Sequence, residues 1–300
     1  MELRCFHFAG KIEWNESTTS REPNMEIKLE RLSKSAFAVM GEEGATNFGI
    51  VRGEDGSALL IDADIRRIDE IEEALRRTQC RTVKYLFITH ENFDHSSAND
   101  YFEKNGTVVI ASTGCLDALK DDGDAKFAEM SGRSPELFEH FPGLKMQLPQ
   151  VVFGDALSIH LPGATVYLRH YEQSHSRGDA TAYFVEDEIF FAGDLLYTDV
   201  HPVTIYGHIE SWIQSLAELR QLSYGKIVPG HGPIGQSQEA GRRNIEKFQS
   251  YLEDFSHRLR DLQDGRKTGP QVVDEMYATY PLLGKRWMVK RNVEYFLQNG

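Results

Sequence analysis

One short segment constrains the fold of this chain more than any other. Residues 89–95, Thr-His-Glu-Asn-Phe-Asp-His, place two histidines and two carboxylates in a tight loop. Residues 83–89, VKYLFIT, have the apolar, β-branched character of a buried strand that ends at His90. Imidazole and carboxylate are the usual protein ligands of zinc, iron and manganese. The segment therefore predicts a metal site in a loop at the end of a buried strand.

Three later segments repeat this arrangement of a strand followed by a metal-ligand residue. His175 lies in the loop after residues 165–171, Asp194 follows residues 188–193, and His231 follows residues 226–230. An isolated histidine is more often a surface or core residue than a ligand. Four such segments in one chain favour a shared metal centre at the ends of neighbouring strands.

These segments resemble the motifs of the metallo-beta-lactamase-fold hydrolases. That family has a Thr-His-x-His-x-Asp-His loop, a histidine in a Gly-rich loop, a Gly-Asp after a strand and a Pro-Gly-His-Gly. The matching residues here, in the same order, are 89–95, 174–179, 192–195 and 229–232. The resemblance covers residues 26–236. It implies an α/β fold, a four-layer αββα sandwich with the site at one edge of the paired sheets.

The resemblance also implies a site for two divalent metal ions, with zinc the first expectation and iron or manganese the alternatives. Its ligands would be His90, Asn92 and His175 for the first metal, Asp94, His95 and His231 for the second, and Asp194 bridging both. Asp62 matches a strand-end aspartate of the family that orients the histidine loop. The alternative for Asp62 is an ordinary residue that ends its strand.

Asn92 departs from the family pattern, because a second histidine usually stands at this position. Its neutral amide oxygen is a harder and poorer ligand for zinc than imidazole is. Three consequences stay open: a single tightly bound metal, a shell completed by water or by Glu91, or a preference for iron or manganese. We favour a functional site over a degenerate one, since every other ligand position is filled.

The expected activity is that of a hydrolase in which metal-bound hydroxide cleaves an ester, thioester, lactone or amide bond of a small molecule. Asp94 is the expected catalytic residue, because it can bind a metal and pass a proton to the leaving group. Tyr197 and His201 follow the bridging aspartate and are predicted to contact the substrate, with surface loop positions as the alternative. The chain shows no GxSxG, P-loop or Rossmann glycine pattern.

Two other functions remain open. The first is a stand-alone di-iron protein that binds or reduces oxygen. Flavodiiron proteins share this fold and have an acidic residue where Asn92 stands, but the stretch after Gly232 is too short for their flavin domain. The second is a non-catalytic ligand sensor, which the presence of Asn92 would explain.

Composition narrows the partners and the organisation of the chain. The net charge of −13 argues against a nucleic acid partner, and no apolar run long enough to span a membrane occurs. Three widely spaced cysteines indicate a reducing compartment, the cytoplasm. We expect an N-terminal extension (1–25), the metal-binding domain (26–236) and C-terminal helices (237–300) packed on it. These helices would cover the site or form a homodimer.

Overall fold

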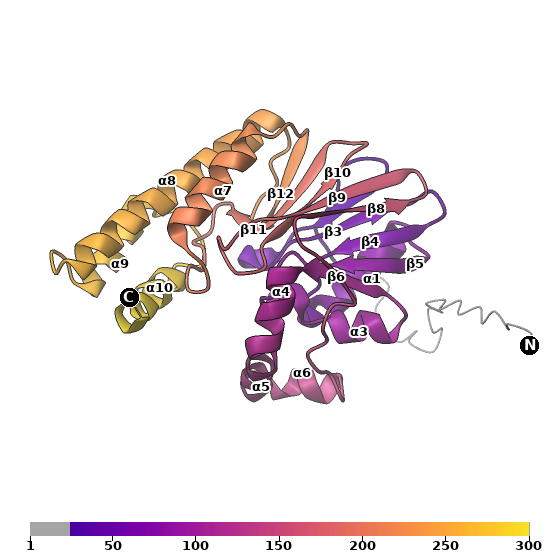
Figure 1. Cartoon of the computed structure of the whole chain (residues 1–300), viewed down its shortest axis with the longest axis horizontal. Helices are drawn as coiled ribbons and strands as arrows, with labels where there is room; N and C mark the ends of the chain where they lie inside the picture. Colours follow the sequence, from indigo (N-terminus) through magenta and orange to yellow (C-terminus); the bar gives the residue numbers. More distant parts are fainter. Residues whose placement is uncertain (1–24, 300) are drawn as a thin grey trace, which may run out of the picture.

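The computed structural model describes residues 25–299 and contains two β-sheets (Figure 1). The predicted extension, residues 1–25, lies almost wholly outside the described residues. The first sheet has the order β1-β2-β3-β4-β5-β6-β7, with β1 (Leu29–Arg31), β2 (Ala36–Val39), β3 (Phe48–Arg52), β4 (Ser57–Ile61), β5 (Thr82–Phe87), β6 (Val108–Ser112) and β7 (Val151–Phe153). The second has the order β12-β11-β10-β9-β8, with β8 (Ala156–Leu161), β9 (Ala164–His170), β10 (Ala180–Phe184), β11 (Ile189–Tyr197) and β12 (Lys226–His231).

Helices cover the outer faces of both sheets (Figure 1). Those of the first half are α1 (Ile68–Arg77), α2 (Phe93–Ser96), α3 (Asn99–Lys104), α4 (Thr113–Ala118), α5 (Asp124–Arg133) and α6 (Pro135–His140). Those of the second half are α7 (Ile209–Gln221), α8 (Gln238–Gln263), α9 (Gly269–Thr279) and α10 (Trp287–Asn299). Short 3-10 turns lie at Glu42–Gly44 and Ile65–Arg67, and one π-helical turn lies at Leu119–Gly123.

Alternation along the strands explains why the sheets stack. In β4, Leu59 and Ile61 belong to the apolar cluster between the two sheets, whereas Ala58 and Leu60 belong to the cluster that packs under α1 and α3. Successive side chains of a strand point to opposite faces, so a strand that is apolar on both faces must be covered on both. A third cluster joins β11 and β12 to α7 and α8. These three interfaces confirm the predicted αββα sandwich.

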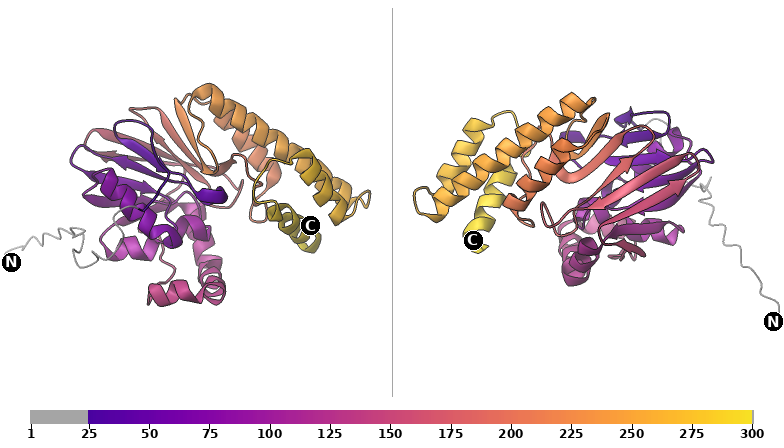
Figure 2. Two further views of the ribbon diagram at one scale, coloured as in Figure 1. Left: turned by 180° about the vertical axis from the view of Figure 1, so that it is seen from behind. Right: turned by 45° about the horizontal axis from the view of Figure 1, so that its top comes forward.

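The C-terminal helices extend the second helical layer beyond the sheets (Figure 2). The C-terminal helices expected at 237–300 begin with α8, whose buried residues Ile245, Phe248 and Leu252 join the cluster beneath it. Helices α9 and α10 follow. Among residues 25–299, no helix combines the length and apolar character that crossing a bilayer requires.

Strand direction determines where the predicted ligands meet. Strands β4, β5 and β6 run parallel to one another, as do β11 and β12. Parallel strands bring their carboxyl ends to one edge of the sheet. Asp62 follows β4, the loop at 88–95 follows β5, and His231 ends β12. Both sheets therefore present polar residues at the same edge of the sandwich.

Candidate metal centre

Six side chains from four separate segments of the chain place their ligand atoms in two adjacent groups. Within each group these atoms lie within 4.8 Å of one another; the groups are His90, His175 and Asp194, and Asp94, His95 and His231. All of these side chains except Asp94 belong to buried residues.

Asp194 joins the two groups. Its Oδ2 atom lies 3.4 Å from Nε2 of His175 and 3.4 Å from Nε2 of His231, and its Oδ1 atom lies 3.2 Å from Nε2 of His95. A single carboxylate thus faces imidazoles of both groups, which is the position that a bridging ligand needs.

A local irregularity in β11 gives Asp194 this position. The register between β11 and β12 shifts between Phe191 and Gly193, and Gly193 has a φ of 53°. A Cβ atom on Gly193 would lie 2.7 Å from the side chain of Thr89. Only glycine combines this conformation with so close an approach to the histidine loop.

Each histidine is held through its Nδ1 atom, which leaves Nε2 facing the centre. The Nδ1 partners are Thr89 Oγ1 for His90 (3.1 Å), Asp62 Oδ2 for His95 (2.9 Å), the Val203 carbonyl for His175 (3.1 Å) and the Gly44 carbonyl for His231 (2.8 Å). A carbonyl or carboxylate only accepts, and the Thr89 hydroxyl already donates to Asp62, so Nδ1 bears the hydrogen and Nε2 keeps a lone pair. This is the arrangement that metal-binding histidines require.

The donor atoms themselves indicate that the centre suits metal ions. Nε2 of His90, Nε2 of His95 and Oδ1 of Asp194 are buried and make no hydrogen bond. Buried polar atoms normally have a partner, and divalent cations bound at the two groups would supply one for all three. The imidazole and carboxylate set fits zinc, iron or manganese.

Burial and neighbouring charges shift the pKa values in this cluster. Burial lowers the pKa of His90 well below its ordinary value and lowers that of His175 to about 4, so both imidazoles are neutral at pH 7, as metal ligands must be. Burial also opposes the protonation of His95, but Asp194 and Asp62 outweigh it and raise the pKa of this histidine. His95 and His231 together outweigh burial at Asp94 and lower its pKa.

Asp62 lies behind the histidine loop. Its carboxylate accepts hydrogen bonds from the backbone N–H of Thr89 (2.7 Å) and from the Thr89 hydroxyl (2.9 Å), as well as from His95. Asp62 itself has a φ of 62° and is buried. It orients one ligand and fixes the start of the loop, which is the role that the resemblance implied.

Asn92 lies at the first group of ligands. Its Nδ2 atom is 2.8 Å from Nε2 of His175. Because Nε2 has one lone pair, it can accept from the amide or bind a metal, but not both. Metal binding by His175 therefore requires the Asn92 amide to turn, and the amide then presents its oxygen to the same position.

Glu91 belongs to neither group of ligand residues. Its carboxylate accepts hydrogen bonds from the Ser176 hydroxyl (3.1 Å) and the Arg177 backbone N–H (3.3 Å). Burial raises its pKa. Glu91 is in neither group of ligand atoms, so the structure does not favour the alternative in which it replaces the missing histidine.

The two predicted substrate residues have different surroundings. Tyr197 lines the pocket beside the metal centre, and its hydroxyl donates a hydrogen bond to Asp194 Oδ2. His201 does not line that pocket: its Nδ1 atom lies 2.9 Å from the Tyr251 hydroxyl on α8. The backbone N–H of His201 donates to the carbonyl of Gly284, and this pairing turns the segment toward the C-terminal helices. His201 is thus corrected to a buried residue of the helical layer.

Sequence reasoning missed Thr46. Its hydroxyl donates a 2.6 Å hydrogen bond to Oδ2 of Asp94. Thr46 precedes β3 and forms an isolated β-bridge with His231, so it reaches the centre from the first sheet. No local pattern marks this threonine, because only the pairing of distant segments brings it to the site.

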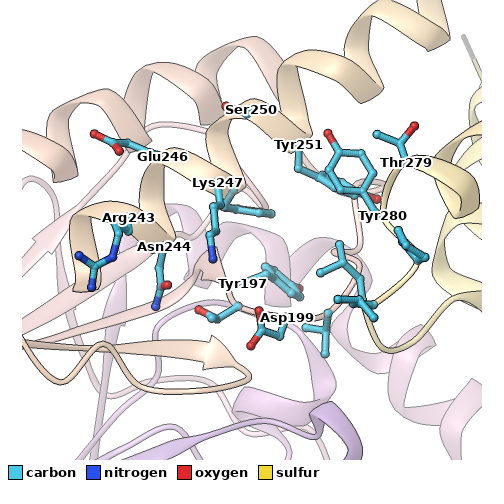
Figure 3. A pocket seen from close by; sticks show the side chains of 16 residues that line it. Tyr197, Asp199, Arg243, Asn244, Glu246, Lys247, Ser250, Tyr251, Thr279 and Tyr280 are labelled. Atoms are coloured by element: carbon cyan, nitrogen blue, oxygen red, sulfur yellow. The ribbon is translucent and has the colours of Figure 1, made fainter. Parts of the chain in front are cut away.

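A pocket of about 320 Å³ opens over the metal centre. Helices α5 and α10 contribute to its walls, and Asp94, Asp194 and His231 lie on its surface. A larger cavity of about 680 Å³ shares Tyr197 with it and lies between α8 and residues 279–283 (Figure 3). None of the six ligand residues lines this larger cavity, so we assign the chemistry to the smaller pocket.

The fold and the ligand set define a class of protein, and sequence comparison identifies it. The model of the metallo-beta-lactamase superfamily matches residues 41–231, so the chain belongs to this superfamily. A relative from Caenorhabditis elegans, "Beta-lactamase-like protein 2 homolog", is 21% identical over 268 residues, covering 84% of this chain and 80% of the relative.

Solved structures show the same fold at low identity. A metallo-beta-lactamase from Pontibacter korlensis is similar with a TM-score of 0.59 and 16% identity, over 76% of this chain and 99% of that chain. The sec-alkylsulfatase Pisa1 from Pseudomonas sp. is similar with a TM-score of 0.64 and 14% identity, over 91% of this chain and 50% of that chain. At these identities the likeness concerns the fold alone.

Proposed function

We propose that this protein is a metal-dependent hydrolase that cleaves an ester, thioester, lactone or amide bond of a small molecule. The observation that supports this most directly is the convergence of six ligand side chains around Asp194, with three buried donor atoms that lack a hydrogen-bond partner. The superfamily, to which the chain belongs, is consistent with hydrolysis.

The residues of the pocket have separate roles in the proposed reaction. His90, His175 and Asp194 would hold one ion, and Asp94, His95 and His231 the other. Divalent ions bound there would lower the pKa of a bound water to about 7 and polarise the scissile carbonyl group. In the absence of a Ser-His-Asp nucleophile motif, water is the expected nucleophile.

Asp94 is the carboxylate best placed to move a proton. Its side chain is 29% exposed and faces the pocket, whereas that of Asp194 is 2% exposed. Thr46 fixes one of its oxygens by donating a hydrogen bond to Oδ2. We assign to Asp94 the transfer of a proton from water to the leaving group. Tyr197 holds Asp194 in place through its hydroxyl.

Alanine variants of Asp94 and His95 test this function. The bound metal per chain is measured by elemental analysis, and hydrolysis is assayed against 4-nitrophenyl esters, thioesters and lactones. Both variants should contain less metal and lose about 100-fold or more in kcat/KM. His160→Ala, which removes an exposed imidazole on β8, should change neither quantity. Unchanged metal content and hydrolysis in both Asp94→Ala and His95→Ala would refute the proposal.

The same elemental analysis separates the alternatives. Two zinc ions per chain with ester hydrolysis support the proposal. Two iron ions with a visible absorption change on exposure to oxygen would instead support the oxygen-binding function. A metal-free or inert protein that still binds small molecules would support the sensor.

A further inference from the structure

The pocket over the metal centre has an unexpected charge. The chain as a whole has a net charge of −13, with 46 acidic against 33 basic side chains. The pocket nevertheless has more basic than acidic residues on its walls: Arg66, Lys126, Arg133, Lys285 and Arg291 against Asp94, Glu129 and Asp194. Two of these acids belong to the metal centre, where bound cations would neutralise them.

Three of the five cations already have a carboxylate partner. Arg66 pairs with Asp64 (2.5 Å), Lys126 pairs with Asp122 (3.2 Å), and Arg133 pairs with Glu129. Ion pairs of this kind leave little charge free for a ligand. These ion pairs account for the presence of Arg66, Lys126 and Arg133 at the pocket without a bound anion.

The other two cations have no carboxylate partner among the described residues. Arg291 has one hydrogen-bond contact, from its guanidinium to the Tyr206 hydroxyl at 3.4 Å. The ammonium group of Lys285 makes no hydrogen bond or ion pair within residues 25–299, and its side chain lies beside Gly44. Both side chains are half-buried at the pocket wall.

Backbone contacts fix the position of Lys285. The N–H of Gly284 donates to the Asp199 carbonyl (2.9 Å), and the N–H of His201 donates to the Gly284 carbonyl (3.0 Å). Lys285 has a φ of 53°, a strained conformation for a residue with a side chain. A Cβ atom on Gly44 would lie 3.2 Å from Cε of Lys285, so the glycine leaves room for the lysine stem.

Arg291 is fixed through its neighbour on α10. Asn292 is buried, donates to the Pro202 carbonyl (2.8 Å) and accepts from the Thr204 N–H (3.1 Å). These contacts hold α10 against the loop that follows β11. The guanidinium of Arg291 is thereby kept on the side of the helix that faces the pocket.

We propose that Lys285 and Arg291 form an anion subsite that binds one phosphate, sulfate or carboxylate group of the substrate beside the metal centre. This inference rests on the proposed hydrolysis and narrows it to anionic small molecules. Phe93, Trp287 and Met288 line the same pocket and suit an apolar portion of that substrate. Both cations lie after residue 231, so the C-terminal segment, and not the region matched by the superfamily, sets this specificity.

A pair of matched esters tests the subsite during turnover. The substrates are 4-nitrophenyl butyrate, which is neutral, and mono-4-nitrophenyl glutarate, which has one carboxylate. Lys285→Gln and Arg291→Gln should each raise KM for the glutarate about tenfold more than they raise KM for the butyrate. Lys290→Gln removes a charge from the exposed side of α10 and should leave both reactions unchanged. Equal KM values in all three variants and the wild type would overturn the proposal.

Calorimetric titration tests the same subsite without turnover. Inorganic phosphate, sulfate and acetate are titrated into the purified metal-loaded protein, and the preferred anion identifies the group. Lys285→Gln and Arg291→Gln should each weaken that binding about tenfold, whereas Lys290→Gln should not. Undiminished anion binding in both pocket variants overturns the subsite. If the protein hydrolyses no ester, thioester, lactone or amide yet these variants lose anion binding, the hydrolase proposal fails while the subsite stands.

Discussion

The two carboxylate oxygens of Asp194 lie at the middle of the metal centre. Its two oxygens face four imidazoles, with the His90 contact at 3.6 Å and the others shorter. The orientation of His175 and His231 comes from backbone carbonyls, which no substitution removes directly. His95 depends instead on the side chain of Asp62. Backbone carbonyls therefore orient two of the histidines, and a side-chain carboxylate orients a third.

Asn92 leads to a prediction about metal affinity. In Asn92→His, an imidazole would replace the neutral amide beside His175, and the first group should bind zinc at least about tenfold more tightly. Competition with a chromogenic zinc chelator measures this affinity. Asn105→His adds an exposed histidine at the end of α3 and serves as the control. An unchanged affinity in Asn92→His would show that this position does not face the first metal.

Asp179 leads to a prediction about pH. Its buried carboxylate accepts hydrogen bonds from the Ser176 N–H (2.9 Å) and hydroxyl (2.7 Å), and burial raises its pKa to about 8. The unfolded value is about 3.9, so the folded state retains a proton that the unfolded state releases. The protonated Asp179 carboxyl contributes its full share of the unfolding free energy below about pH 4. This contribution is lost as the pH rises through about 8, and the unfolding free energy falls by at most about 1.4 kcal/mol per pH unit.

In Asp179→Asn the side chain stays neutral at every pH, so the decrease in unfolding free energy that Asp179 causes with rising pH should disappear. The unfolding free energy of the variant minus that of the wild type should increase steadily as the pH is raised. Urea denaturation of both proteins with a chelator present measures the difference. Parallel pH profiles for the two proteins would show that the Asp179 carboxyl is ionised in the folded state.

At the level of elements, α10 supports the metal centre from a distance. Asn292 binds both sides of the loop at 202–204, and the carbonyl of Val203 within that loop holds Nδ1 of His175. The helix therefore acts on a ligand through one loop. The same helix supplies Arg291 to the pocket.

Asn292→Ala should weaken both the fold and the centre. It leaves a buried carbonyl and a backbone N–H without partners, at a cost of about 1–3 kcal/mol in unfolding free energy. Because the loop then holds His175 less firmly, zinc affinity should fall about 10-fold or more. Denaturant unfolding and chelator competition measure the two effects. Asn299→Ala, near the exposed end of α10, is the control. Lost stability with unchanged zinc affinity would disprove the link through the loop.

At the level of the whole molecule, the two sheets meet at the metal centre. His90, Asp94 and His95 lie in the segment after β5 of the first sheet, whereas His175 follows β9 and Asp194 and His231 lie in β11 and β12 of the second. Ions bound between them would connect the two halves of the sandwich. Their binding free energy would add to the stability of the folded state, because unfolding destroys the site.

Metal removal should therefore destabilise the whole molecule. Treatment with a chelator should lower the Tm of the wild type by about 5–10 °C, the effect of a ligand at about 100 times its Kd. His95→Ala should show a smaller decrease, since its second group is already incomplete. Differential scanning calorimetry measures both. An unchanged Tm in the wild type would contradict a role for metals in joining the sheets.

The sequence by itself determined the sandwich, the superfamily and the positions of the ligand motifs. The apolar, β-branched run at 83–89 and the metal-ligand residues after strands are local patterns, and local patterns can be read directly. The tertiary structure decided the surroundings of these residues: Thr46 beside Asp94, Glu91 turned away, His201 buried under α8, and Lys285 with Arg291 at the pocket. Each of these positions depends on where a distant segment of the chain packs. The sequence around a residue does not show which distant segment will contact it.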